Sequence, residues 1–260
     1  MITNTLSFAV ASGAVITWRI DEGEPDPSGY WWSLPVVAET YDGFLNDING
    51  FHVKESHVFE ALNTAKNGQV TEGNVGGGTG MMCHGFKGGI GTASRIFSIH
   101  EKEYTLGVLV QANYGARKDL TIAGVPVGKE ITDLKRERNS DKEFNEGDGS
   151  IIVVVATDVP LMPHQLKRLA RRVPLGIARV GTVAHDGSGD IFIAFSNANN
   201  GDGFPSEITQ IEMVPNGLLN PVFEATVHAT EEAIINALIA AETMKGADDN
   251  LAHALPHDRL

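Results

Sequence analysis

The most strongly patterned stretch of the chain is a run of β-branched residues at 149–158, which reads GSIIVVVATD. Such a run predicts a strand that is buried on both faces. Ser150 is its first side chain, and it follows Gly149 where the polar segment 139–149 enters the predicted core. A Gly-Ser pair before a strand is typical of a turn. The same pair also places a hydroxyl at the start of a rigid strand, which is a suitable position for a nucleophile.

Other elements are predicted from alternation, β-branched content and apolar positions three and four apart. Strands are expected at 5–20 with a bend at Gly13, and at 92–99, 104–112, 181–184 and 191–195. Helices are expected at 54–66, at 163–172 with a break at Pro174, and from Asn220 to Gly246. Because strands precede helices in each half, we expect a single α+β layered domain over 1–260 rather than alternating βαβ units.

The remaining segments are polar or rich in glycine. Residues 73–91 contain many glycines, which predicts tight turns and close approach of the backbone. Residues 128–149 are charged and nearly devoid of large apolar side chains, so we expect an exposed, mobile connection that ends at Ser150. The tail 247–260 is expected to be loosely held.

Composition narrows the functional classes. The formal net charge of −13 argues against a nucleic-acid partner, because phosphates would be repelled. No apolar run of about 18 residues occurs, so we expect no membrane span. The single Cys83 rules out an internal disulfide and fits a reducing compartment. The first residues lack the basic start and apolar block of a signal peptide, which favours a cytoplasmic protein.

Common cofactor and metal motifs do not match. Lys87 follows Phe86 in a segment that continues as a strand, which is not the pattern of a phosphate-binding loop. The nine histidines do not cluster: His52 and His57 are five residues apart, and His164 and His185 stand alone. We therefore expect neither a metal nor another cofactor. No Gly-x-Ser-x-Gly elbow is present, and no histidine is an obvious triad base, so a nucleophile at Ser150 needs another activator.

One activator is the α-amine of Ser150 itself, which becomes available only after the Gly149–Ser150 bond is cut. An α-amine titrates at about 7.7, close enough to neutrality to serve as a base. The cut could be self-made. Ser150 Oγ would attack the carbonyl carbon of Gly149, and the ester formed by the N→O shift would then hydrolyse.

Long blocks of the chain resemble the DmpA-type aminopeptidases, also described as L-aminopeptidase/D-esterases and β-peptidyl aminopeptidases of the P1/S58 peptidase family. The blocks are VAETYDGFLNDINGFHV (37–53), GTGMMCHGFKGGIGTASR (78–95), YTLGVLVQANYG (104–115), IAGVPVG (122–128), GSIIVVVATDVPLMPHQLKRLARR (149–172) and SGDIFIAFSNAN (188–199). The resemblance implies an αββα layered N-terminal-nucleophile hydrolase that cuts itself between Gly149 and Ser150. The products would be an α chain of residues 1–149 and a β chain of residues 150–260.

The resemblance also implies site roles, taken residue by residue. Ser150 would be the nucleophile, assisted by Ser188 and Asp190; some relatives have Glu at the latter position. Asn113 and Tyr41 would stabilise the oxyanion. Two further residues would bind substrate: Glu39 would hold the free amine, and Trp32 would wall the pocket. Without the resemblance, Ser188 between two glycines is typical of a turn, and Asn113 could equally be a turn residue at the end of a strand. Glu39 is more distinctive, because it ends an apolar run and a buried carboxylate needs a partner.

The family usually carries a further stretch before Thr3, so we expect this chain to be truncated at its N-terminus, and a signal peptide could have been lost with it. The expected substrate is a small peptide, amide or ester with a free amine, and the expected assembly is a homo-oligomer, with neither nucleic acid nor membrane as partner. Two alternatives stay open. One is an acyltransferase of the ornithine acetyltransferase type, although those proteins cleave before Thr. The other is an inactive remnant that acts as a binding protein.

Overall fold

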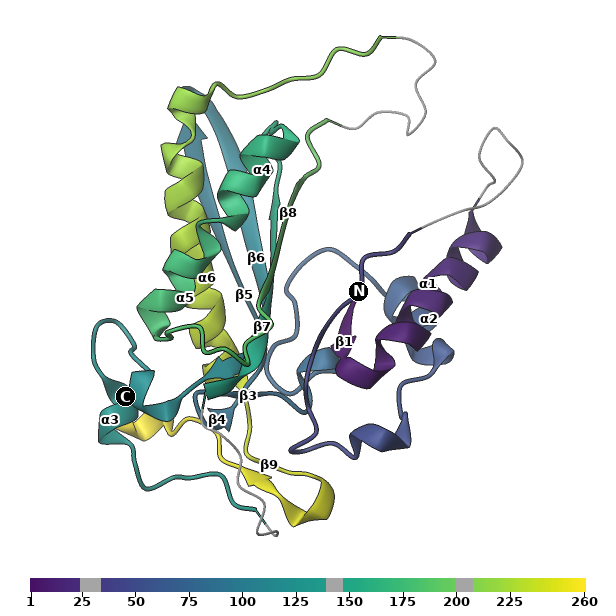
Figure 1. Cartoon of the computed structure of the whole chain (residues 1–260). Coiled ribbons are helices and arrows are strands. Elements are labelled where there is room, and N and C mark those ends of the chain that lie inside the picture. Colours follow the sequence, from purple (N-terminus) through teal and green to yellow (C-terminus); the bar gives the residue numbers. More distant parts are fainter. Residues whose placement is uncertain (24–33, 139–146, 200–207) are drawn as a thin grey trace.

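A four-stranded mixed sheet forms the centre of the structure, a computed structural model that describes residues 1–23, 34–138, 147–199 and 208–260 (Figure 1). Its strands, in spatial order, are β5 (Gly89–Ile99), β6 (Lys102–Gly115), β7 (Gly147–Thr157) and β8 (Ile191–Ser196). β6 pairs antiparallel with both β5 and β7, whereas β8 runs parallel to β7. The predicted central strand is therefore an inner strand of the sheet.

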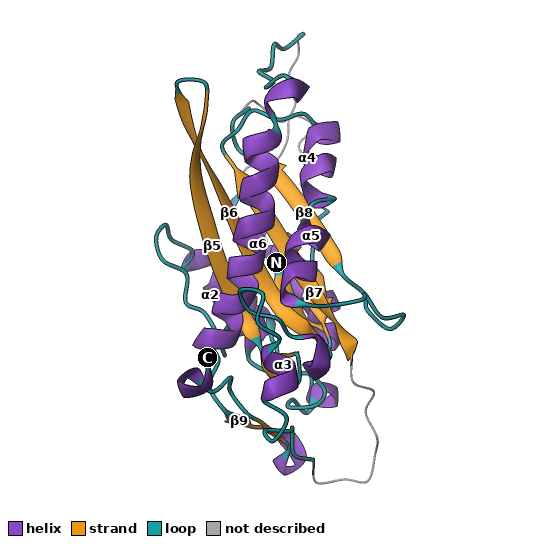
Figure 2. Cartoon of the chain, turned by 90° about the vertical axis from the view of Figure 1, so that its left-hand side faces the viewer, coloured by secondary structure: helices purple, strands orange, loops and turns teal. Residues whose placement is uncertain are grey.

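Three helices cover one face of this sheet: α4 (Pro163–Ala170), α5 (Val173–Val180) and α6 (Asn220–Ala240) (Figures 1 and 2). The core between them takes alternate residues from the inner strands: Leu106, Val108 and Val110 of β6, and Ile151, Val153 and Val155 of β7. Because side chains alternate across a strand, the intervening residues project from the opposite face. Asn113 and Ser150 belong to that second set.

The opposite face meets a smaller sheet near the first half of β7. β1 (Ile2–Asn4) pairs in parallel with β2 (Ala38–Thr40), and α1 (Phe8–Glu22) and α2 (Glu55–Asn63) lie beyond it (Figure 1). The buried Gln111 joins the two sheets, since its Nε2 donates to Thr3 O at 3.0 Å and to Thr40 Oγ1 at 2.7 Å. The described residues thus form the expected αββα order of layers.

Short elements connect these layers. The strand pairs are β3 (Met82–Cys83) with β4 (Phe86–Lys87), and β9 (Met244–Lys245) with β10 (Leu251–Ala252); α3 spans Val127–Glu130. Single 3-10 turns lie at Thr5–Ser7, Ile48–Gly50, Gly76–Gly78, Arg117–Asp119, Asn216–Leu218, Ala247–Asp249 and His257–Arg259. None of the described helices is long and apolar enough to cross a membrane.

Several predicted elements are confirmed. The helices at 54–66 and 163–172 and the strands at 92–99, 104–112 and 191–195 all form, with β5 and β6 longer than expected. The helix predicted at 163–172, α4, ends at Ala170, and a new helix, α5, begins at Val173. Pro174 lies in the first turn of α5, where the missing N–H of proline costs no helical hydrogen bond. The segment from β7 through α4 and α5 to β8 is a βαβ unit with parallel strands, which the expectation of no alternating units did not include.

Other predictions were wrong. Residues 5–20 form a helix, because Ala11 and Ala14 are buried three residues apart against α2 and outweigh the β preference of Val, Ile and Thr. Residues 181–184 do not form a strand. The last long helix ends at Ala240, where the next residue becomes extended, rather than at Gly246.

Two segments expected to be loose are held by the core. In the connection 128–138, Ile131 is buried, and Glu137 pairs with Leu251 through backbone hydrogen bonds. The tail likewise buries Ala252 and Leu255, and His253 O accepts a hydrogen bond from Lys87 N. The rest of the predicted mobile connection, at 139–146, lies outside the described residues.

Gly91 provides a test of the packing between β5 and α6. A Cβ at this position would lie 2.0 Å from Ala233 O and 2.6 Å from Ala237 N of the helix backbone, whereas a Cβ at Gly107 of β6 would meet nothing within 4 Å. We expect Gly91→Ala to lower the free energy of unfolding by about 1–3 kcal/mol, the usual cost of overpacking. Gly107→Ala should change it by less than about 1 kcal/mol. Denaturant unfolding of both variants checks this, and equal effects would contradict close packing at Gly91.

Candidate active site

Strand pairing places the candidate nucleophile. Ser150 lies opposite Asn113 in the β6–β7 ladder. On the other side, the pairing of Ile152 with Ile191 brings the loop before β8 beside Ser150. In that loop, Gly189 N donates a hydrogen bond of 2.9 Å to Ser150 Oγ. The predicted nucleophile thus accepts a backbone hydrogen bond that sequence reasoning had not identified.

Gly149 is required by its surroundings. Its φ of +151° is one that residues with a Cβ rarely adopt, and an added Cβ would lie 2.2 Å from Asn113 O. The register of the β6–β7 ladder also shifts between Asn113 and Gly115. The peptide before Ser150 therefore lies where the sheet is irregular and where the backbone of β6 approaches closely.

The predicted assisting pair, Ser188 and Asp190, is also close to Ser150. Ser188 Oγ donates to Asp190 Oδ1 at 2.6 Å, and the same carboxylate oxygen accepts from Ile151 N at 3.1 Å. Asp190 therefore interacts with the amide directly after Ser150. The short loop that carries Ser188, Gly189 and Asp190 is held against the start of β7 by two hydrogen bonds, from Gly189 N and to Asp190 Oδ1.

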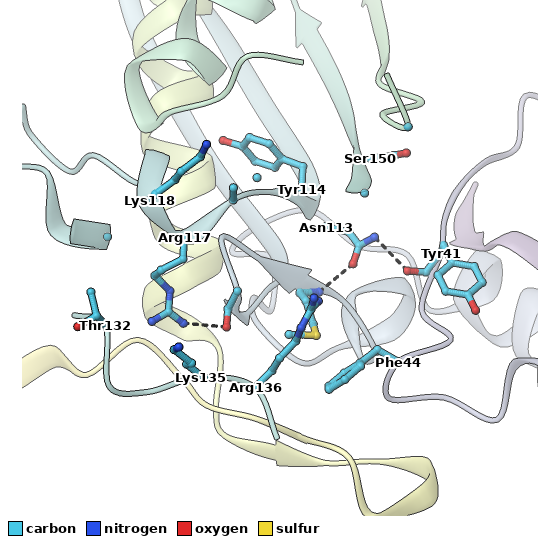
Figure 3. A pocket seen from close by; sticks show the side chains of 18 of the residues that line it. Tyr41, Phe44, Asn113, Tyr114, Arg117, Lys118, Thr132, Lys135, Arg136 and Ser150 are labelled. Carbon is cyan, nitrogen blue, oxygen red and sulfur yellow. Dashed lines mark hydrogen bonds between the residues drawn. The ribbon is translucent and has the colours of Figure 1, made fainter. Parts of the chain in front are cut away.

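Two hydrogen bonds fix the orientation of the Asn113 side chain. Asn113 Oδ1 accepts from Met82 N at 2.9 Å, and its Nδ2 donates to Tyr41 O at 3.0 Å (Figure 3). Because the oxygen is occupied by an N–H, the amide nitrogen is the end that remains for a ligand. An amide nitrogen carries two donors, of which Tyr41 O takes one.

The loop that provides Met82 N is held by a buried cation. Lys87 is fully buried, and its Nζ donates to the carbonyls of Gly78 (3.1 Å), Met81 (2.9 Å) and Gly88 (2.7 Å). Burial lowers the pKa of Lys87 from 10.5 to about 7. In the sequence, Lys87 served only to exclude a phosphate-binding loop. A lysine within a glycine-rich segment was the one local feature that could have indicated its structural role.

A cavity of about 850 Å³ opens beside these groups. Tyr41, Asn113, Gly149 and Ser150 line it (Figure 3). Part of the lining is apolar, from Phe44 and Met82 among others, and part is strongly basic. The structure thus brings the predicted nucleophile and the predicted oxyanion donor to one cavity.

Two predicted residues are placed differently from the expectation, and a third is not described. The ring of Tyr41 is half exposed and points away from Asn113 (Figure 3), so it is the carbonyl of Tyr41 and not its hydroxyl that reaches the amide. Glu39 lies on β2, does not line the cavity, and accepts a hydrogen bond from Thr5 Oγ1. Trp32 lies outside the described residues.

The histidines do not form a catalytic or metal cluster in the described ranges. His52 and His57 are exposed, and no group of three His, Cys, Asp or Glu in the described parts of the chain could hold a metal ion. His84 was not singled out from the sequence. It is fully buried, burial lowers its pKa to about 4, and its Nδ1 lies 3.0 Å from Ala116 O. A neutral ring that donates from Nδ1 satisfies this contact.

Comparison with known proteins assigns the chain to a family. The model of the family described as Peptidase family S58 matches residues 1–252. The chain belongs to peptidase family S58. It is 51% identical to the β-peptidyl aminopeptidase BapA of Sphingosinicella microcystinivorans, an alignment that covers all of this chain and 67% of that protein. The BapA of Sphingosinicella xenopeptidilytica is 44% identical, with 100% and 66% covered.

Solved structures agree with this family assignment. The L-aminopeptidase D-Ala-esterase/amidase of Ochrobactrum anthropi, described as a prototype of the serine aminopeptidases and a variant of the Ntn hydrolase fold, superposes with a TM-score of 0.89. It is 48% identical, over 99% of this chain and 70% of that one. A Burkholderia β-aminopeptidase gives a TM-score of 0.87 and 42% identity, over 99% and 70%. This S58 chain is a serine aminopeptidase with an Ntn-hydrolase fold, and it spans about two thirds of the length of these relatives.

The buried Lys87 of this S58 peptidase predicts a pH dependence of stability. Between pH 7 and 9 the folded chain has released the Lys87 proton while the unfolded chain still holds it, so raising the pH favours the folded state. We expect the free energy of unfolding of the wild type to rise by up to about 1.4 kcal/mol per pH unit relative to Lys87→Met. Denaturant unfolding at pH 7, 8 and 9 measures this. Lys102→Met, at an exposed position, should keep the wild-type slope; equal slopes for all three proteins would show that Lys87 stays charged.

Proposed function

We propose that Ser150 cuts the Gly149–Ser150 bond and that the processed protein removes N-terminal residues from small peptides, amides or esters with a free amine. The observation that carries this proposal is the placement of Ser150 opposite Asn113 beside one cavity. The nucleophile and an oxyanion donor are both needed at one carbonyl, and here two neighbouring strands hold them in register.

In the proposed reaction, the α-amine of Ser150 takes the proton from Ser150 Oγ as the oxygen attacks the substrate carbonyl. The tetrahedral intermediate collapses when the bond to the leaving group breaks, and the leaving group receives the proton. Water then attacks the ester on Ser150 Oγ and releases the N-terminal residue. The hydrogen bond from Gly189 N to Ser150 Oγ supports this mechanism, because a backbone donor stabilises negative charge on that oxygen.

The second N–H of Asn113 is the proposed donor to the oxyanion. Its orientation is set by Met82 N and Tyr41 O, so little reorganisation is needed when charge develops. The hydroxyl of Tyr41 would join it after rotation of the ring. The exposed fraction of Tyr41, 49%, leaves room for that rotation.

Asp190 and Ser188 are proposed to position the amine that cleavage would create. Asp190 Oδ1 already accepts from Ile151 N, so the new α-amine would form one residue away from this carboxylate. Ser188 Oγ, which donates to the same oxygen, would take part in the same network. Glu39 is proposed to bind the amine of the substrate and Trp32 to wall the pocket, in line with the resemblance.

Processing would give chains of residues 1–149 and 150–260, which stay together as one domain because β6 and β7 pair along most of their length. We also expect a homo-oligomer in the cytoplasm. The buried thiol of Cys83, whose pKa burial raises to about 12, fits a reducing compartment.

Self-cleavage is tested by the mass of the purified protein. The intact mass of the purified wild type should show two species that part between Gly149 and Ser150, whereas Ser150→Ala should remain a single chain of 27.8 kDa and should not hydrolyse alanine p-nitroanilide. Ser98→Ala, at an exposed position on β5, should behave as the wild type. Retained turnover in Ser150→Ala would contradict the nucleophile, and turnover of acetylornithine alone would favour an acyltransferase.

The second prediction concerns Asp190. We expect Asp190→Asn to lower kcat by about 100-fold with a smaller change in KM, since it removes a charge beside the base without touching the cavity. Asp186→Asn removes the same charge from the same loop at an exposed position, and should keep kcat within about twofold. Equal kcat values for the two variants would contradict a role for Asp190 in catalysis.

A further inference from the structure

The cavity beside Ser150 has an unusual charge for this protein. The whole chain carries a formal charge of −13, yet the cavity lining contains five cationic residues and, among the described residues, no carboxylate. The cations are Arg117, Lys118, Lys129, Lys135 and Arg136. A basic cavity in an acidic protein focuses positive potential at the site and attracts anionic groups.

The basic residues come from two segments that face the same space. Arg117 and Lys118 follow the end of β6, only four and five residues after Asn113, and the others lie on the segment from α3 to Arg136 (Figure 3). Arg117 is held rigidly: its guanidinium stacks 3.3 Å from the Phe86 ring centroid and donates to the carbonyls of His84, Gly85 and Ile131.

Two carboxylates of the same segment are directed to other partners. Asp133 pairs with Arg259 at 2.9 Å, and Glu137 lies 3.2 Å from His253. Neither of them lines the cavity. Lys118 and Lys135 are exposed at its wall, so their charges can reach a ligand without the cost of burial.

The basic residues lie on one side of the catalytic groups. In Figure 3, Asn113 and Ser150 lie between Tyr41 on one side and Arg117, Lys118 and Lys135 on the other. Tyr41 follows the strand that carries Glu39, the residue proposed to bind the substrate amine. With the substrate amine held on the Tyr41 side, as proposed, the leaving group would extend from the scissile carbonyl toward the basic side.

We propose that this basic end of the cavity binds the C-terminal carboxylate of a short peptide, so that the preferred substrate is a small zwitterionic peptide rather than an uncharged amide or ester. The inference rests on the proposed aminopeptidase function and adds the class of leaving group. Lys118 and Lys135 are the specificity-determining residues.

The test compares two substrates that differ in one charge: an alanyl dipeptide with a free C-terminal carboxylate and the same dipeptide as its C-terminal carboxamide. We expect the wild type to have a KM about tenfold lower for the carboxylate form. This preference should be lost in the double variant Lys118→Gln, Lys135→Gln, because KM for the carboxylate form rises toward that for the carboxamide. Raising the ionic strength should increase KM for the carboxylate form only.

The matched control is the double variant Lys66→Gln, Lys102→Gln, which removes the same charge from exposed positions that do not line the cavity and should keep the preference. Equal KM values for the two substrates in the wild type, or a preference that survives in the Lys118–Lys135 variant, would overturn the proposal. Calorimetric measurement of the binding of both dipeptides to uncut Ser150→Ala protein tests the carboxylate site separately from the proposed aminopeptidase activity. Tighter binding of the carboxylate form supports the basic site even if the wild type shows no turnover, and equal binding contradicts it.

Discussion

The pairing of β6 with β7 is the constraint on which the rest of the site depends. One register sets Asn113 opposite Ser150, and the same pairing brings the backbone of β6 so close to Gly149 that no Cβ fits there. A slip by one residue would turn Ser150 into the helix-covered core, because side chains alternate across a strand. The buried apolar residues of β7 oppose such a slip, so the stability of the core and the position of Ser150 have one physical cause.

Around this pair, the backbone provides much of the chemistry. Gly189 N donates to Ser150 Oγ, Met82 N orients the amide of Asn113, and Ile151 N donates to Asp190. Each of these N–H groups lies on a short loop or a strand end that is fixed elsewhere, most clearly by Lys87, whose buried Nζ lies within hydrogen-bond distance of three carbonyls of the glycine-rich segment. Backbone donors held in this way need little reorganisation when charge develops during a reaction.

The electrostatic pattern separates the two ends of the cavity. Asn113 lies between Tyr41 and the basic residues, which come from the end of β6 and from the segment that begins at α3. None of the described lining residues carries a negative charge. In a protein with a net charge of −13, this arrangement concentrates attraction for anions near Ser150. The proposed preference for a zwitterionic peptide rests on this distribution of charge around the cavity.

The sequence alone was enough to predict the central strand, the helices α2, α4 and α6, and the family, because apolar periodicity and motif blocks are local features of the chain. It also indicated Ser150, Asn113, Ser188 and Asp190, and these lie together. The remaining features depend on contacts between distant residues. Packing of Ala11 and Ala14 against α2 favours a helix in a segment rich in β-branched residues, and burial of Ile131 and Leu255 holds two polar segments in place. The half-exposed ring of Tyr41 points away from the amide of Asn113. The hydrogen bond from Gly189 and the basic end of the cavity depend on segments far apart in the chain, so no local pattern could indicate them.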